Sequence, residues 1–277
     1  MRKKVGNVIT SDLLECLEDR HLRNEVTLED HCLIRILSGE IRIVSSDTNR
    51  IFTKGNTFFL PRRQLITTIK KDKDNEKFKC VLIILRKDQL KKYYTQYPAN
   101  RSTAHSQTIK SYENHPLLES YFSSLPPYFE IFGELPDHLI SLKIDEAVTI
   151  LRTIDVNIDA DLADFTEQGK IDLEEFMERN YMFNMPLEKF GYLTGRSLTT
   201  FKRDFHKIYG TTPQRWLTKK RLKLAYYLIS KDSKKPAEIY RDAGFENLSH
   251  FSNAFKKQFG FAPNTYFKNY FNDKIIE

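Results

Sequence analysis

Apolar residues in the C-terminal part of the chain recur at helical spacing, and the same pattern occurs twice, 50 residues apart. The positions are Leu198, Phe201, Phe205 and Ile208 in the first copy, and Leu248, Phe251, Phe255 and Phe259 in the second. The residues that follow are repeated as well, since Gly210 corresponds to Gly260 and Pro213 to Pro263. An internal repeat with these features indicates two copies of one helical unit.

The residues around each apolar pattern predict a helix-turn-helix. In the first copy, a short helix over residues 187–193 precedes a turn at residues 194–196, and Ser197 suits the N-cap of the second helix. In the second copy, the corresponding short helix covers residues 236–243, and Asn247 is the N-cap. The glycine that follows each second helix favours a left-handed C-terminal cap. A helix-turn-helix of this type places its second helix in the DNA major groove.

The polar side of each second helix supplies candidate base-reading residues. Phe201 and Phe205 define the buried side of the first of these helices, and at about 100° per residue the polar side chains lie opposite. The candidate DNA-binding residues are Thr199, Lys202, Arg203 and His206 in the first copy, and Ser249, Ser252, Asn253 and Lys256 in the second. Arginine and asparagine can make paired hydrogen bonds to guanine and adenine edges. A solvated helix face is the alternative interpretation for any single residue, but it explains two matching faces less well.

Residues 171–270 resemble the DNA-binding domain of the AraC/XylS family of bacterial transcription regulators. The matching residues are Leu193, Gly195, Ser197, Phe201, Arg203, Phe205, Gly210 and Pro213, followed by Ile239, Ala243, Gly244, Phe245, Phe251, Phe255, Lys256, Phe259, Gly260 and Pro263. Gly191 and Tyr240 depart from the family pattern, which prefers alanine at both positions. The resemblance implies a domain of seven helices that binds promoters and recruits RNA polymerase. It favours activation of transcription over repression. It also implies a linking helix over residues 214–229, with an inner stripe of Trp216, Leu217, Leu224, Ala225 and Leu228.

Residues 1 to about 95 contain the short apolar runs that are typical of β-strands. The predicted strands are residues 32–37, 41–44, 50–53, 57–60, 65–69 and 78–85. Gly39 separates the first two runs and Gly55 the next two, so each of these pairs is predicted to form a hairpin. The pattern favours a small antiparallel barrel or sandwich. Gly39, Gly55 and Pro61 are similar in placement to landmarks of the cupin-like barrel that many AraC-type regulators carry.

The middle of the chain is predicted to be helical after a polar linker or loop at residues 96–112. The predicted helices are residues 116–125, 136–154 and 158–165. The second of them has an apolar stripe wider than one face needs, which packing on the barrel and homodimerisation explain about equally well. Its segment 142–147 resembles a helix that supports dimerisation in a subset of the family.

A break in pattern at residues 168–170 predicts the boundary between two domains. The predicted domains are residues 1–165, with the barrel at about 20–95 and helices at about 115–165, and residues 170–277. The predicted fold class is α+β, with an N-terminal antiparallel cupin-like β-barrel plus helices and a C-terminal all-α tandem helix-turn-helix domain.

Charge is distributed unevenly between these domains. Residues 170–277 contain 20 Lys and Arg against 12 Asp and Glu, a net charge of +8, and the total of +7 leaves −1 for residues 1–169. A basic excess confined to the predicted DNA-binding half is what contact with phosphates requires. No apolar run has membrane-spanning length, no secretory signal is visible, and the three cysteines are widely spaced. A cytoplasmic protein with reduced thiols and no membrane association is therefore expected.

Few residues in the chain suggest catalysis or metal binding. The barrel segment has two histidines, His21 and His31, without a clustered set of carboxylates, so no metal site, cofactor or catalytic site is predicted. Arg35, Arg62 and Arg63 could bind an anionic effector, although exposed surface charge is the favoured interpretation.

The sequence therefore predicts a regulator of transcription that binds specific double-stranded DNA, most simply an activator, with an N-terminal sensing or partner-binding domain. Its effector is predicted to be a small molecule inside the barrel or a protein bound to residues 96–165. A non-specific, basic architectural DNA-binding protein is the alternative. An enzyme with a DNA-binding tail is a third and weaker hypothesis.

Overall fold

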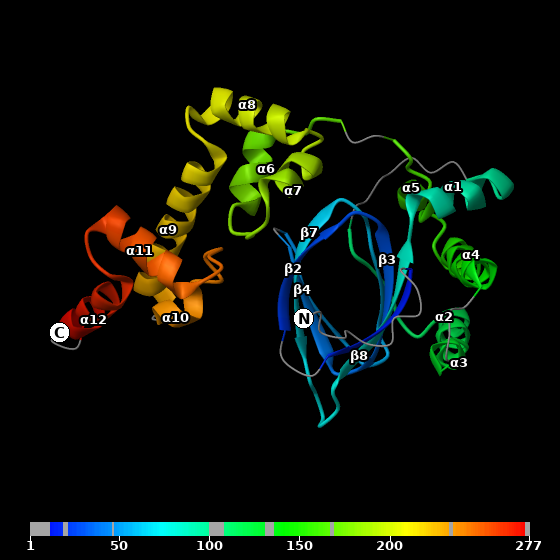
Figure 1. Ribbon diagram of the computed structural model, residues 1–277. Helices are drawn as coiled ribbons and strands as arrows, with labels where there is room; N and C mark the ends of the chain where they lie inside the picture. Colours follow the sequence, from blue (N-terminus) through cyan, green and yellow to red (C-terminus); the bar gives the residue numbers. More distant parts are fainter. Residues whose placement is uncertain are drawn as a thin grey trace. The chain divides into compact units, whose positions relative to one another are not determined.

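The chain consists of two compact units, Met1–Thr166 and Glu167–Glu277 (Figure 1). The computed structural model describes residues 12–18, 22–45, 47–99, 108–130, 136–166, 169–232 and 235–274. Within these ranges the first unit contains antiparallel sheets and helices, whereas the second is helical. The predicted α+β fold class is confirmed.

The first unit is built on two sheets. Their strands are β1 (Leu13–Glu18), β2 (Leu22–Leu28), β3 (His31–Ser38), β4 (Glu40–Val44), β5 (Asn49–Thr53), β6 (Thr57–Leu60), β7 (Gln64–Lys71), β8 (Phe78–Leu85) and β9 (Lys110–Tyr112). The five-stranded sheet has the order β1-β8-β3-β6-β9, and the four-stranded sheet has the order β2-β7-β4-β5. All of these neighbours pair antiparallel.

Alternation along the strands divides the apolar side chains between two cores. In β3, Ile34 and Ile36 point into the space between the sheets, where they share a cluster with Ile41 and Phe52 of the four-stranded sheet. Leu33, the residue before Ile34, belongs to a separate cluster on the outer face. Because successive side chains of a strand point to opposite faces, one apolar strand serves both cores.

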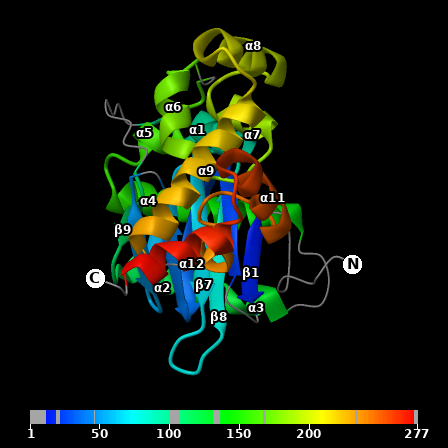
Figure 2. The same cartoon turned by 90° about the vertical axis from the view of Figure 1, so that its left-hand side faces the viewer.

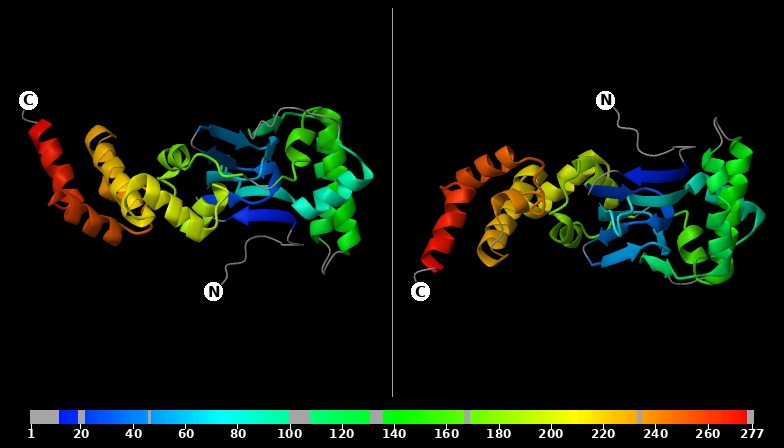
Figure 3. Two further views of the ribbon diagram at one scale, coloured as in Figure 1. Left: turned by 90° about the horizontal axis from the view of Figure 1, so that it is seen from above. Right: turned by 90° about the horizontal axis from the view of Figure 1, so that it is seen from below.

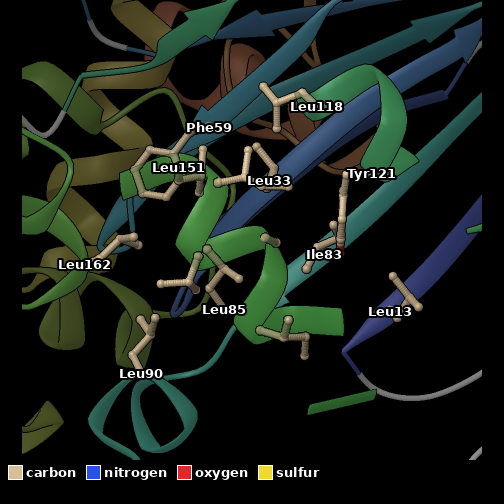
Figure 4. Close-up of a cluster of buried hydrophobic side chains, with 14 of the residues drawn as sticks. Leu13, Leu33, Phe59, Ile83, Leu85, Leu90, Leu118, Tyr121, Leu151 and Leu162 are labelled. Carbon is tan, nitrogen blue, oxygen red and sulfur yellow. The ribbon is translucent and has the colours of Figure 1, made fainter. Parts of the chain in front are cut away.

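Helices cover the outer face of the five-stranded sheet, and both views of Figure 3 show them together on one side of the strands. They are α1 (Lys87–Gln96), α2 (Pro116–Ser123), α3 (Pro126–Glu130), α4 (Asp137–Ile154) and α5 (Asp159–Leu162). Leu33, Phe59 and Ile83 from the strands meet Leu118 and Leu151 from the helices in one core (Figure 4). The helices thus remove this apolar sheet face from water.

The strands do not pair as the sequence predicts. The predicted hairpins over residues 32–44 and 50–60 are wrong, because β3 and β6 lie in the five-stranded sheet and β4 and β5 in the other. The hairpin that does form joins β4 to β5, with Val44 opposite Asn49. A turn residue signals a change of direction, but it does not specify which sheet the next strand will join.

The corner between β3 and β4 requires glycine at position 39. Gly39 has a φ of +74°, and a Cβ atom there would lie 2.7 Å from the carbonyl oxygen of Lys71 and 2.8 Å from Cα of Phe78. The chain therefore passes tightly against the ends of β7 and β8 as it crosses between the sheets.

The segment after β8 also differs from the prediction. Residues 87–96 form α1 rather than the end of the barrel, and Lys110–Tyr112, predicted as part of a loop, pairs with β6 as β9. Residues 100–107 of the predicted linker lie outside the described residues. The predicted helices at 116–125, 136–154 and 158–165 correspond to α2, α4 and α5, whereas α3 was not predicted.

The three arginines considered for anion binding are engaged in ion pairs. Arg35 donates to both carboxylate oxygens of Glu119, at 2.6 and 2.7 Å. Arg62 and Arg63 contact one carboxylate oxygen of Asp164 at 3.6 and 3.5 Å. Their side chains are between 9% and 11% exposed, so the interpretation as exposed surface charge is wrong. Arg62 and Arg63 hold the end of the first unit against the turn between β6 and β7.

His31, the first residue of β3, is buried beside the same turn. Its Nδ1 accepts a hydrogen bond from the backbone N–H of Arg62 at 3.1 Å, and its ring stacks on Phe59. Burial, together with the positive charge of Arg62, lowers the pKa of His31 to about 3. The imidazole is therefore neutral in the folded protein at neutral pH.

We expect the folded first unit to lose stability as the pH falls below 6.5. The unfolded chain binds a proton at His31 near pH 6.5, whereas the folded chain does so only near pH 3. Each pH unit within that interval therefore costs about 1.4 kcal/mol of unfolding free energy. Urea unfolding at about pH 7 and about pH 5 measures the loss, which His31→Gln should abolish and a substitution of the exposed His138 should not. Parallel pH curves for wild type and His31→Gln would contradict this expectation.

The second unit is built around one long helix. Its helices are α6 (Leu173–Asn180), α7 (Leu187–Leu193), α8 (Leu198–Tyr209), α9 (Pro213–Asp232), α10 (Pro236–Ile239), α11 (Leu248–Phe259) and α12 (Pro263–Lys274). Seven helices in the described part of this unit agree with the number that the resemblance implies. Figures 1 and 2 both show α8 at one end of α9, with α11 and α12 toward the other end.

Candidate nucleic-acid interface

Local hydrogen bonds set the ends of α8, as the sequence predicts. Ser197 Oγ accepts a hydrogen bond from the N–H of Thr200 at 3.3 Å, which satisfies one free donor of the first turn. At the other end, Gly210 adopts a φ of +63°, and its N–H donates to the carbonyl of His206 at 2.9 Å. The preceding helix α7 covers the predicted range, so the first helix-turn-helix is confirmed.

The second unit of the repeat has the same caps. Asn247 Oδ1 accepts a hydrogen bond from the N–H of His250 at 2.7 Å, and Gly260 has a φ of +86°. The helix before the turn is shorter than predicted, since α10 ends at Ile239 rather than at Ala243. Beyond Ile239 the backbone hydrogen bonds include spans of three and five residues, which turns form and an α-helix does not.

Two aromatic cores hold α8 and α11 in place. The fully buried rings are Phe201 and Phe205 in α8, and Phe251 and Phe255 in α11. The first core also contains residues of α7 and α9, and the second contains residues of α9, α10 and α12. These buried sides are the predicted ones, except that Leu248 is 38% exposed in α11 and Ile208 is 46% exposed in α8. Tyr209 covers that end of the core instead, with its ring 4.4 Å from Phe205.

The linking helix α9 contributes to both cores from different faces. Trp216 and Leu217 belong to the first core and Ala225 to the second, within the predicted stripe. The second half of the stripe is wrong, because the buried residues are Leu222 and Ile229, whereas Leu224 and Leu228 are half-buried. One stripe cannot describe a helix that packs against two cores in different directions.

Seven of the eight predicted DNA-binding side chains are exposed, and Ser252 is half-buried. The exposed ones are Thr199, Lys202, Arg203 and His206 on α8, and Ser249, Asn253 and Lys256 on α11. The fold thus places the predicted residues of each copy on one outer helix face, opposite the buried phenylalanines.

An ion cluster lies beside the outer face of α8. The carboxylate of Asp204 contacts Arg196 at 3.2 Å, Arg203 at 3.3 Å and Lys170 at 3.5 Å. Although desolvation raises the pKa of Asp204, the hydrogen bond from Arg196 and the charges of Lys170 and Arg203 leave that pKa below its ordinary value. The Arg196 side chain is 9% exposed and that of Arg203 is 61% exposed. Arg196 is therefore a fixed partner of the carboxylate, and Arg203 can turn toward a ligand.

The fold brings together three basic residues that the sequence analysis missed. Arg215 and Lys219 on α9 and Lys257 on α11 line one cavity. Arg215 and Lys219 are about one turn apart on α9, but Lys257 is distant from them in the sequence, and only the packing of α9 against α11 makes it their neighbour.

Several features of the described residues bear on other kinds of chemistry. None of the helices in these ranges is long and apolar enough to cross a membrane. In the same part of the chain, no group of three or more His, Cys, Asp or Glu side chains is placed to hold a metal ion. Cys16, Cys32 and Cys80 are not joined in disulfides.

Both units match known protein families. Residues 31–160 match the family described as the ExsA N-terminal regulatory domain, and residues 193–269 match the family described as the helix-turn-helix domain. The chain belongs to the AraC/XylS family. The resemblance drawn from the repeated helix-turn-helix is therefore confirmed.

This AraC/XylS family member is similar to several regulators. The thermoregulatory protein LcrF of Yersinia pestis is 29% identical over 153 residues, which are 53% of this chain and 55% of LcrF. The HTH-type transcriptional regulator ExsA of Pseudomonas aeruginosa is 25% identical over 235 residues, 82% of each chain. A crystal structure of ToxT from Vibrio cholerae is 13% identical, with a TM-score of 0.42 and coverage of 95% of this chain and 98% of that chain. The chain thus spans little more than half the length of LcrF.

Proposed function

We propose that this chain is a sequence-specific DNA-binding transcription activator whose second unit binds double-stranded DNA. The observation that carries the proposal is the pair of equivalent, exposed polar faces on α8 and α11, within residues 170–277 that have a net charge of +8. Each helix enters one of two successive major-groove segments. The surrounding lysines and arginines neutralise phosphates. Names of relatives such as the virulence regulon transcriptional activator VirF of Yersinia enterocolitica support the activating role.

Within this proposal, the eight residues of the two outer faces contact DNA. Arg203 and Asn253 occupy equivalent positions, two residues after Phe201 and Phe251 respectively. Both side chains have the paired donors or acceptors that base edges require, so they read bases. Lys256 lies one turn farther along α11 and contacts phosphate.

The first unit, by this proposal, carries the regulation. It senses a small molecule or binds a protein partner. The domain at residues 1–165 carries this sensing, and the domain at residues 170–277 binds DNA. The protein is cytoplasmic and recruits RNA polymerase. A homodimer contact through residues 136–154 is supported by α4, which buries Ile144 and Leu151 in its own core but leaves Leu142 61% exposed. Leu142 is the apolar side chain of α4 that a second copy would cover.

Substitutions on the two outer faces test the proposal. Arg203→Ala and Asn253→Ala should each weaken binding to a preferred duplex by about 1–3 kcal/mol and relax the preference at one base position. Lys256→Ala should weaken binding to all duplexes about equally and lower the salt slope of binding by about one. Anisotropy titrations of the full chain measure these effects, with a preferred duplex, its single-base variants and a scrambled duplex at two salt concentrations.

A matched control separates these effects from a general loss of charge. Arg179→Ala removes an exposed arginine of α6 that pairs with Glu175, outside the two faces, and should leave base preference unchanged. Each variant must keep the wild-type melting temperature. Full base preference in the Arg203 and Asn253 variants would show that the faces are assigned wrongly. If the wild type bound the preferred and the scrambled duplex with equal affinity, the result would favour the alternative function, that of a non-specific architectural DNA-binding protein.

A further inference from the structure

The second unit contains a basic hollow that lies outside the two helix faces. A cavity of about 460 Å³ opens between α9 and α11. Arg215, Lys219 and Lys257 line it, and Leu222 and Ala254 supply apolar lining. Its volume is within the range of sites that hold small molecules or parts of larger ones.

The three cations of this hollow have no acidic partner in the part of the chain that the structure describes. Within the described residues, none of Arg215, Lys219 and Lys257 forms an ion pair. Their neighbours on α9 differ, because Lys220 pairs with Glu178 at 2.6 Å and Arg221 donates to two backbone carbonyls at 2.8 and 2.6 Å. On α9, Lys220 and Arg221 thus bind other parts of the second unit, whereas Arg215 and Lys219 face the cavity. Three positive side chains without a counter-charge favour an anionic ligand.

The polar groups around these cations suit a phosphodiester. Thr218 supplies a hydroxyl, and Gln214 and Gln258 supply side-chain amides, all of which can bond phosphate oxygens. The apolar lining can contact the hydrocarbon part of a sugar. A phosphate flanked by sugars therefore matches the lining better than a small inorganic anion does.

The hollow also lies next to the residues proposed to read DNA. Lys257 follows Asn253 by four residues, so the two side chains are neighbours along one stripe of α11. When α11 enters the major groove with Asn253 toward the bases, the α9 side of the helix faces the phosphates that border the groove. We infer that the hollow between α9 and α11 receives the phosphodiester backbone that flanks the bases read by α11. This inference rests on the proposed function.

The test compares cavity variants with a control on the same helix. Arg215→Gln, Lys219→Gln and Lys257→Gln should each lower the affinity of the full chain for every duplex about three- to tenfold, and lower the salt slope by about one. Lys223→Gln removes an exposed charge of α9 that does not line the cavity and should change the slope much less. Lys257→Arg, which keeps the charge, should bind almost as wild type. All variants must keep the wild-type melting temperature.

Neutral methylphosphonate groups, placed one at a time in a preferred duplex, then locate the contact. At one flanking position the methylphosphonate should cost wild type the same fold-change as Lys257→Gln, and it should cost the variant nothing further. If the losses from the methylphosphonate and from Lys257→Gln add at every position, the inference is overturned. It is also overturned if the cavity variants bind like Lys223→Gln while the wild type still binds with sequence preference. Absence of wild-type DNA binding would instead overturn the proposed function.

A small phosphate-bearing ligand is the other source of the same chemistry. Titration of ATP without DNA, followed by the melting temperature, tests it. We expect no stabilisation that depends on Lys257. Stabilisation of wild type but not of Lys257→Gln, together with unchanged DNA affinity in the cavity variants, would assign the cavity to a small ligand and overturn the inference.

Discussion

Gly244→Ala should destabilise the second unit by about 3 kcal/mol or more. Gly244 lies in the turn of the second helix-turn-helix with a φ of +82°, and a Cβ atom there would lie 2.4 Å from the carbonyl oxygen of Met182 and 2.7 Å from Nε of Arg221. Arg221 cannot move away cheaply, since its guanidinium donates to the carbonyls of Tyr181 and Phe183. The added methyl group therefore separates the turn from α9 or breaks these bonds. Urea unfolding followed by circular dichroism measures the loss.

Gly260→Ala is the matched control for this substitution. Gly260 has nearly the same backbone conformation, with a φ of +86°, but no heavy atom lies within 4 Å of its added Cβ. Its substitution should cost only the strain of the left-handed conformation, about 1–2 kcal/mol. Equal losses at the two positions would show that the close approach of Gly244 to Met182 and Arg221 has no energetic importance.

Phe205→Ala should destabilise the second unit by about 3–5 kcal/mol, the range for deleting a fully buried aromatic ring. Phe205 is 0% exposed and contacts the rings of Phe201, Tyr209 and Trp216, with ring centroids 5.8, 4.4 and 5.6 Å away. Phe201 and Tyr209 are held in α8 and Trp216 in α9, so the three rings cannot all collapse into the vacated space. Trp216 is the only tryptophan of the chain, so its fluorescence during urea unfolding reports this core directly.

Phe255→Ala, the equivalent deletion in the second core, tests whether the two cores unfold together. Phe255 is also 0% exposed, and α9 runs without interruption from Trp216 to Ile229 between the cores. Because one rigid helix supplies buried residues to both, we expect the loss in the second core to shift the Trp216 transition as well. A Trp216 transition that stays at the wild-type urea concentration would mean that the two helix-turn-helix units unfold separately.

The ends and the outer faces of α8 and α11 could be predicted from the sequence because local interactions determine them. The side chains of Ser197 and Asn247 accept hydrogen bonds from N–H groups three residues farther along. Gly210 and Gly260 immediately follow the last residues of α8 and α11 and end these helices in the left-handed conformation. Each of these interactions is complete within one helical turn, so distant parts of the chain change it little. The outer faces follow from the same helices, since a buried side at helical spacing defines the side opposite.

The partners of the strands and the burial of charged residues were decided by the tertiary structure. β3 pairs with β8, about 50 residues away, and not with β4 beyond Gly39. Arg62 is buried because Asp164, 102 residues farther along, reaches it. The cavity lined by Arg215 and Lys257 likewise exists only where α9 meets α11. Sheet pairing, ion pairing and cavities depend on side chains that meet only after folding, and no short stretch of the sequence contains both partners.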